Sequence, residues 1–174
     1  MRISKYLLVL AVLLSLPMAA SGQQKMGYID SNRILQEYED VRDAQAKLEK
    51  ETRRLQAEYN VYVTRLDSMQ REFDKQRLLL SNDMVRTKEV EIQTLLQSTQ
   101  LYQQQVFGQE GELYRFQAQL MAPILDKIDS AVKQVGAEKS YDFIIDAAGG
   151  ALVYALPAHD LTVDVIAQLR RNSK

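Results

Sequence analysis

The most regular feature of this sequence is an apolar residue that recurs alternately every four and every three positions. The first run has twelve positions, of which ten are apolar. A period of 3.5 residues keeps one stripe facing a partner only if helices supercoil around each other. An ordinary amphipathic helix on a globular core rarely continues beyond about 25 residues, so the pattern favours a coiled coil. The positions are Ile34, Tyr38, Val41, Gln45, Leu48, Thr52, Leu55, Tyr59, Tyr62, Leu66, Met69 and Phe73.

A second run of the same kind follows one interruption. Ser81, Asn82 and Asp83 are typical of turns and helix starts. The two stripes predict an antiparallel helical hairpin with its tip at about residues 79–84 and arms of roughly 70 Å. Pro123 predicts a kink at the root of the arm. The second stripe comprises Val85, Lys88, Ile92, Leu95, Thr99, Tyr102, Val106, Gln109, Leu113, Phe116 and Leu120.

The two ends of the chain predict a small β-containing body. Residues 26–30, 141–146 and 151–155 have strand patterns, and Gly149-Gly150 separates the last two as in a hairpin. Asp160 is expected to cap a final helix whose apolar face is Leu161, Val165, Ile166 and Leu169. The predicted fold is therefore mainly α with a small β part. Its body comprises residues 23–33 and 124–174, and its arm residues 34–123.

Such a body is too small to bury much apolar surface by itself. Several copies that pool their strands around a symmetry axis would solve this problem, so a homo-oligomer is expected. The candidate residues for that contact are Met26, Tyr28, Ile29, Phe143, Ile144, Ile145 and Val153.

The first 22 residues have the three parts of a cleavable signal peptide: a basic head, an apolar run and small residues at a cleavage site. The apolar run of residues 7–16 is about half the length that spans a bilayer. Removing the segment takes away Arg2 and Lys5 and no acidic residue, so 20 basic residues remain against 23 acidic ones. The mature chain is expected to be soluble and periplasmic.

Composition argues against several kinds of chemistry. The chain has no cysteine, one histidine and a formal net charge of −1. The residues that a cysteine-ligated metal site, a catalytic triad or a nucleic-acid-binding surface would require are therefore absent or scarce. Neither an enzyme nor a cofactor is expected. Asp30, Asp142, Asp146 and Asp160 lie near the predicted strands, where caps and turns explain them, and His159 is expected in a solvated loop.

The mature sequence resembles the Skp/OmpH family of periplasmic chaperones over essentially its whole length. The most specific parts are residues 25–30 leading into 32–35, and residues 141–146 followed by Asp160-Leu161-Thr162 with Val165 and Leu169. The resemblance implies a homotrimer in which three hairpins hang from a shared body. It also implies an ATP-independent holdase for unfolded outer-membrane proteins, which the insertion machinery then receives. Family members are often strongly basic, and this chain is not, so no lipopolysaccharide site is carried over.

Apolar residues outside the seam are the candidates for contact with such clients, because a promiscuous binder needs adaptable contacts spread over a surface. The alternative is that they flank the seam and widen it. Three of them gather at the predicted tip. The candidates are Val63, Leu78, Leu79, Met84, Val90, Leu96, Leu101 and Phe107.

Gly108 and Gly111 lie inside the second predicted arm helix, where each costs about 1 kcal/mol relative to alanine. They are hinge candidates, and alanine at both positions is expected to stabilise and stiffen the arm. The alternative is a close helix crossing that needs small residues.

For the whole protein, the alternative function is a structural coiled-coil spacer or scaffold of the cell envelope.

Overall fold

The structure is a computed structural model that describes residues 24–173. The predicted signal peptide lies outside the described residues. The elements, in chain order, are β1 (Met26–Ile29), α2 (Ser31–Glu37), α3 (Glu39–Gln76), η1 (Arg77–Leu79), α4 (Asn82–Phe107), α5 (Glu112–Glu138), β2 (Phe143–Asp146), η2 (Ala147–Gly149), η3 (Pro157–His159) and α6 (Thr162–Asn172).

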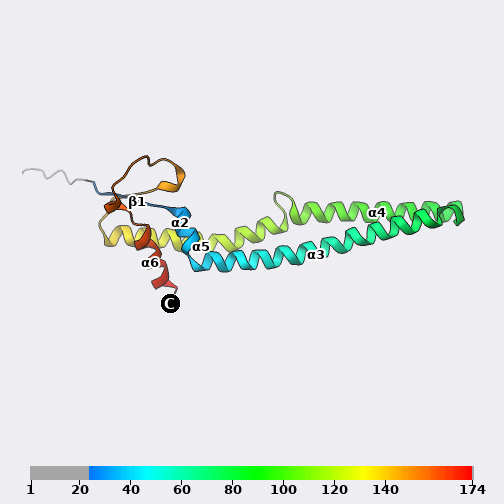
Figure 1. Cartoon of the computed structure of the whole chain (residues 1–174), viewed down its shortest axis with the longest axis horizontal. Coiled ribbons are helices and arrows are strands. Elements are labelled where there is room, and N and C mark those ends of the chain that lie inside the picture. The colour runs from blue at the N-terminus through cyan, green and yellow to red at the C-terminus, as the bar shows by residue number, and fades with distance from the viewer. Residues whose placement is uncertain (1–23, 174) are drawn as a thin grey trace, which may run out of the picture.

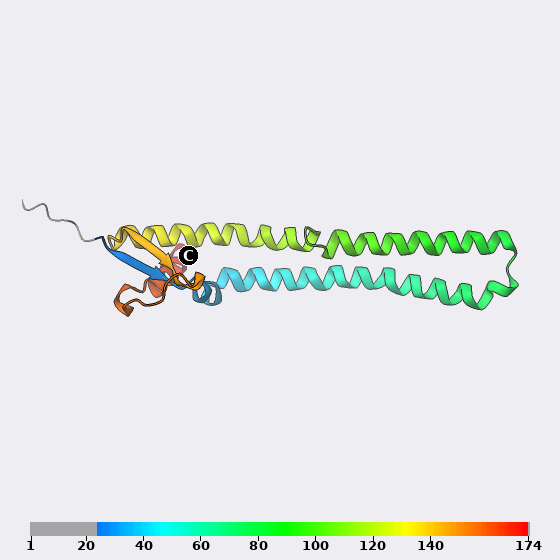
Figure 2. The ribbon, with the colours of Figure 1, turned by 90° about the horizontal axis from the view of Figure 1, so that it is seen from above.

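A long helical hairpin dominates the molecule, as predicted. Helix α3 runs away from the base, and α4 and α5 run back beside it (Figures 1 and 2). The turn occupies residues 77–81, and the Ser81 hydroxyl accepts a hydrogen bond from the Met84 amide to cap α4. The chain reverses here because the short polar residues supply that cap.

The predicted seam lies between the two arms, but its burial is uneven. Val41, Leu55, Thr99 and Val106 are buried, whereas the seam residues nearer the tip are half-buried or, as at Tyr62 and Lys88, exposed. The polar seam position Gln45 is exposed. Two helices alone cover a seam from one side, so partial exposure is expected wherever no third element packs against the pair.

Tyr38 interrupts the first helix, which the sequence pattern did not predict. Its ψ of 126° is extended, so α2 ends at Glu37 and α3 starts afresh at Glu39. The ring is buried in the core, and the hydroxyl donates to Asp40 Oδ2 at 2.7 Å. Burial of this ring is therefore favoured over an unbroken helix, and α2 turns away from the axis of α3 (Figure 1).

The second arm breaks at Gly108–Gly111 and not at Pro123. Helix α5 continues through Pro123 into the base and ends at Glu138. Pro123 has no N–H and removes one helix hydrogen bond, and the burial of Ile124 and Ile128, which follow it in α5, offsets that loss.

The base contains one parallel pair of strands, with Met26 opposite Phe143 and Ile29 opposite Asp146. The prediction of a third strand at residues 151–155 was wrong for this chain alone, as was the hairpin at Gly149-Gly150. Gly150 adopts a φ of 74°, and the following residues run on as an open loop in which Val153 is 97% exposed. A strand forms only beside another strand, and neither strand of residues 24–173 pairs with this segment.

The core lies where α2, α5 and α6 meet below the strands. The predicted apolar face of the last helix is confirmed, because Leu161, Val165, Ile166 and Leu169 are all buried. The expected cap at Asp160 was displaced by one residue: Leu161 occupies the N-cap position of α6 without a side-chain cap bond, and Asp160 accepts from the Thr162 amide at 2.9 Å in a turn just before the helix. Between residues 24 and 173, none of the helices combines the length and apolar character needed to cross a bilayer.

Candidate functional site

Six of the eight predicted contact residues are exposed on the arm. Their exposure makes them available to a partner without rearrangement of the hairpin. Leu96 and Phe107 are instead half-buried. The exposed six are Val63, Leu78, Leu79, Met84, Val90 and Leu101.

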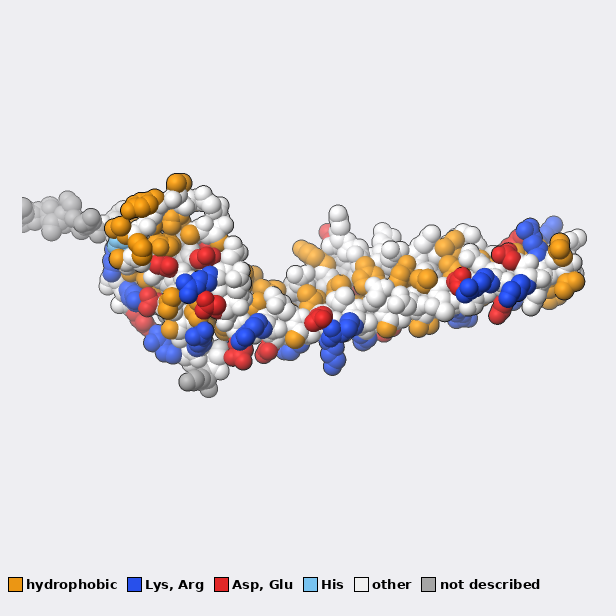
Figure 3. Space-filling view, in the orientation of Figure 1, with side chains coloured by type: hydrophobic (Ala, Val, Ile, Leu, Met, Phe, Trp, Pro, Cys, Tyr) orange, Lys and Arg blue, Asp and Glu red, His pale blue; other side chains and the backbone are white. Residues whose placement is uncertain are grey.

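The tip holds the most exposed apolar side chains of the arm. Leu78 and Leu79 lie in the short η1 helix and are 97% and 86% exposed, and Met84 in the first turn of α4 is 51% exposed. Figure 3 shows hydrophobic side chains at this end beside basic and acidic ones. Flexible leucine and methionine side chains on a solvated end can contact many different apolar sequences.

Phe107 belongs to an aromatic cluster inside the hairpin. Its ring meets Tyr59 edge-on at 6.1 Å, and Tyr102 stacks on Tyr59 at 6.4 Å and meets Tyr62 at a tilt at 5.1 Å, all between ring centroids. This packing agrees with the alternative that Phe107 widens the seam. The cluster lies on the tip side of the break in the second arm and ties α3 to α4.

An ion-pair network crosses the same region. Tyr102 donates to Glu58 Oε2 at 2.8 Å, and burial together with this carboxylate raises the pKa of Tyr102 to about 12. Arg54 pairs with Glu51 and Glu58 and lies 3.7 Å from Glu112, the first residue of α5. This network was not identified from the sequence, although the spacing of Glu51, Arg54 and Glu58, three and four residues apart on one helix, could have indicated it. Helix α3 therefore contacts both α4 and α5, the helices on either side of the break.

Gly108 and Gly111 lie at the ends of a loop, not within a helix. Helix α4 ends at Phe107, and α5 begins at Glu112. A Cβ on Gly108 would lie 2.3 Å from the Gln104 carbonyl oxygen, and one on Gly111 would lie 2.5 Å from the Val106 carbonyl oxygen. The glycines are needed here because the backbone approaches itself closely.

Alanine at both positions is therefore expected to destabilise the arm, contrary to the expectation from sequence. The free energy of unfolding should fall by about 1–3 kcal/mol because the backbone must move to admit two methyl groups. Urea unfolding followed by circular dichroism measures this change. Gly149→Ala is the matched control, since no atom lies within 4 Å of its Cβ position. Equal stability of the double variant and the control would mean that the loop repacks at no cost.

The residues predicted to form a body surface divide into three groups. Ile29 is buried in the core, and Tyr28, Ile144 and Ile145 are half-buried. Met26, Phe143 and Val153 are exposed, together with Tyr154. Figure 3 shows hydrophobic side chains gathered on this part of the base. The base thus has an apolar surface that its own chain leaves open.

The four acidic residues near the strands act as caps and ties. Each accepts a hydrogen bond from a backbone amide: Asp30 from Arg33, Asp142 from Lys25, Asp146 from Ser31 and Ala148, and Asp160 from Thr162. Within residues 24–173 there is no group of three or more His, Cys, Asp or Glu side chains placed to hold a metal ion.

His159 is not the solvated loop residue that the sequence predicted. Its ring meets Tyr141 edge-on at 6.4 Å, and its Nδ1 atom is buried without a hydrogen-bond partner among residues 24–173.

Asp40 joins the arm to the base through a charged hydrogen bond. Lys127 Nζ donates to its Oδ2 at 2.7 Å, and this bond, followed by the one from the Tyr38 hydroxyl, lowers the pKa of Asp40 from its ordinary value. A lowered pKa in the folded state means that folding favours the ionised form. The resulting stability is present above the unfolded pKa and is lost as pH falls through the folded pKa.

Asp40→Asn is expected to destabilise the protein at about pH 7 by about 1 kcal/mol, and by less at about pH 2, because the wild-type carboxylate takes up a proton as the pH falls through its lowered folded-state pKa. Urea titrations of both proteins at the two pH values measure this difference. Asp43→Asn, which lies one turn along α3, serves as the control. A stability difference that stays constant with pH would contradict a role for the ionised Asp40.

Comparisons with known proteins agree with this architecture. The chain is 29% identical to the Chaperone protein Skp of Yersinia enterocolitica over 175 residues, which cover 95% of this chain and 99% of that protein. It is 29% identical to the Chaperone protein Skp of Pectobacterium atrosepticum, over 92% of this chain and 94% of that one.

A solved structure has the same fold. The crystal structure of a protein from Caulobacter crescentus, assigned as an OmpH-like outer membrane chaperone, superposes with a TM-score of 0.77 over 88% of each chain, at 18% identity. The family described as "Outer membrane protein (OmpH-like)" matches residues 25–169. The helical hairpin on a small parallel-stranded base, together with this match over most of the sequence, shows that the chain belongs to the OmpH-like family.

Proposed function

We propose that this protein is an ATP-independent holdase chaperone of the periplasm, which binds unfolded outer-membrane proteins and prevents their aggregation before membrane insertion. The observation that carries the proposal is an arm that ends in nearly fully exposed Leu78 and Leu79. Exposed apolar side chains on a long, solvated support bind many unfolded sequences weakly, which is what a holdase must do. The names of the relatives from Yersinia and Pectobacterium support the same activity.

Export through a cleaved signal peptide is part of this proposal. The basic head, short apolar run and small residues of the first 22 positions support it. A chaperone that meets outer-membrane proteins before insertion has to act between the two membranes. Its clients would then pass from the arm to the outer-membrane insertion machinery.

The second part of the proposal is that the protein forms a homotrimer through its base. Within residues 24–173, β2 pairs only with β1 and its outer edge is unpaired, and a two-stranded sheet is marginal by itself. The β-prone residues 151–155, which stay open here, are suited to pair with a strand of another copy. Exposed Met26, Phe143 and Val153 would be covered in such an assembly.

The loop at Gly108–Gly111 supplies the hinge in this proposal. Two helices meet there without a continuous backbone hydrogen-bond ladder, so only the unbroken α3 beside them resists pivoting of the outer half of the arm against the inner half. An arm that pivots can adjust to clients of different size.

The alternative is a coiled-coil spacer or scaffold of the cell envelope with one fixed partner. A spacer needs a stiff arm, and this arm has a glycine-bounded break and an apolar tip. Those two features favour the adaptable binder.

Refolding a urea-denatured outer-membrane β-barrel with and without the purified protein tests the function. Light scattering should fall when the protein is present without ATP, and the mass of the free protein should correspond to three chains. Unchanged aggregation would favour the scaffold, and a monomeric mass would contradict the trimer.

A further inference from the structure

The two faces of the arm differ in charge at its root. Ala44 of α3 and Leu120 of α5 mark the boundary between them, because both line the hollow on each face. One face carries Asp40, Asp43, Lys47 and Lys127, and the Lys127–Asp40 ion pair spans the two helices at 2.7 Å. On the other face, ten residues line a groove of about 320 Å³, and none of them is charged.

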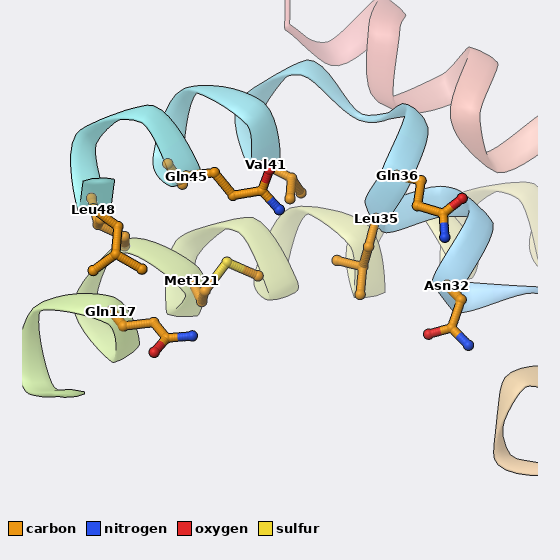
Figure 4. A pocket seen from close by; sticks show the side chains of 10 residues that line it. Asn32, Leu35, Gln36, Val41, Gln45, Leu48, Gln117 and Met121 are labelled. Carbon is orange, nitrogen blue, oxygen red and sulfur yellow. The ribbon is translucent and has the colours of Figure 1, made fainter. Parts of the chain in front are cut away.

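Carboxamides surround this groove, which we call the amide groove (Figure 4). Asn32 and Gln36 project from α2, Gln45 from α3 and Gln117 from α5, and all four are exposed. The groove exists because α2 turns away from α3 at Tyr38, which opens the space between α2 and α5.

Leucine and methionine side chains form the apolar part of the groove. Leu35, Leu48 and Met121 are each half-buried, so part of every side chain remains open to a partner. Unbranched or γ-branched side chains of this kind adapt their shape to different contacts.

We propose that the amide groove binds an extended, uncharged stretch of unfolded polypeptide, an inference that rests on the proposed holdase function. Carboxamides donate to peptide carbonyls and accept from peptide N–H groups in any sequence, because every residue offers the same backbone groups. Apolar side chains of the bound stretch contact the leucines and Met121. The uncharged lining matches a segment without charges, whereas a charged segment would be desolvated there without a partner.

A second copy of this chain is the competing occupant. The base already offers exposed Met26, Phe143 and Val153 for self-association, and these belong to the strands and the loop rather than to the groove. A ring of four exposed carboxamides also differs from the apolar centre that permanent interfaces have. The groove therefore suits a transient, sequence-tolerant partner better than a permanent one.

Gln117→Glu tests the proposal, with Gln119→Glu as the matched control. Both changes add the same charge to α5 two residues apart, but Gln117 lines the amide groove and Gln119 lines the charged face. The probe is a fluorescently labelled, urea-denatured eight-stranded outer-membrane β-barrel, and the Kd and the oligomer mass are measured together. We expect Gln117→Glu to raise the Kd about tenfold and Gln119→Glu to raise it less than about twofold.

The outcomes distinguish a failure of the amide-groove inference from a failure of the proposed holdase function. If the wild-type protein fails to bind the barrel, the proposed function fails and the groove inference falls with it. If the wild-type binds and both variants bind equally well, only the amide groove is refuted. A change in oligomer mass for Gln117→Glu alone would assign the groove to a second copy and would also overturn the proposal. A photo-crosslinker placed at Gln45 should capture the barrel and not another copy of the chain.

Discussion

Glutamine in place of Leu78, Leu79 and Met84 together is expected to weaken the binding of an unfolded outer-membrane protein by roughly two orders of magnitude. These side chains are 97%, 86% and 51% exposed, so little of their apolar surface contributes to the fold. Covering each of them with client would contribute about 1 kcal/mol, and about 3 kcal/mol corresponds to that change in Kd. Fluorescence titration of a denatured β-barrel measures the effect.

Charge at the same end provides the control for this prediction. Arg71, Lys75 and Arg86 are exposed near the tip, and their joint replacement by glutamine removes positive charge while leaving the apolar side chains in place. We expect that variant to bind within about threefold of the wild type at 0.15 M salt, where exposed charges are screened. If the charge variant loses binding and the apolar variant keeps it, the tip acts through electrostatics and the apolar interpretation is wrong. Both variants should keep the helix content and the mass of the wild-type protein.

Ile34→Ala is expected to lower the free energy of unfolding by about 2–5 kcal/mol. Ile34 is fully buried in α2 and belongs to the core cluster that joins the base to the arm. Removing its side-chain atoms leaves a cavity that the surrounding helices can only partly fill. Urea unfolding at one fixed protein concentration measures the loss, because oligomerisation makes the midpoint depend on concentration.

Leu78→Ala is the control for the core variant, since it truncates an apolar side chain that is almost fully exposed. Its free energy of unfolding should stay within about 0.5 kcal/mol of the wild type. If Leu78→Ala lowers the free energy of unfolding as much as Ile34→Ala does, the exposure of Leu78 in the single chain does not describe its surroundings in solution. This would be the case if the tip were covered in the assembled protein.

The candidate site was only partly visible in the sequence. The tip residues could be predicted because a turn between two apolar stripes has few neighbours to bury Leu78 and Leu79. The role of Phe107 could not, because its contact with Tyr59 depends on how the two arms align. The amide groove was also invisible, since Asn32 and Gln117 are 85 positions apart in the sequence and line one groove only because the chain changes direction between α2 and α3 at Tyr38.

Local periodicity by itself determined the hairpin, its turn and the buried face of the last helix. A repeat of 3.5 residues specifies a straight apolar stripe, and the stripe of Leu161, Val165 and Leu169 needs only a surface to cover it. Tertiary structure alone decided where the helices break. Tyr38 ends α2 because its ring is buried and its hydroxyl reaches Asp40, whereas α5 passes through Pro123 because Ile124 and Ile128, which follow it, are buried in the core. The open segment at residues 151–155 has the same origin: strand propensity is local, but a strand forms only where another strand offers an edge.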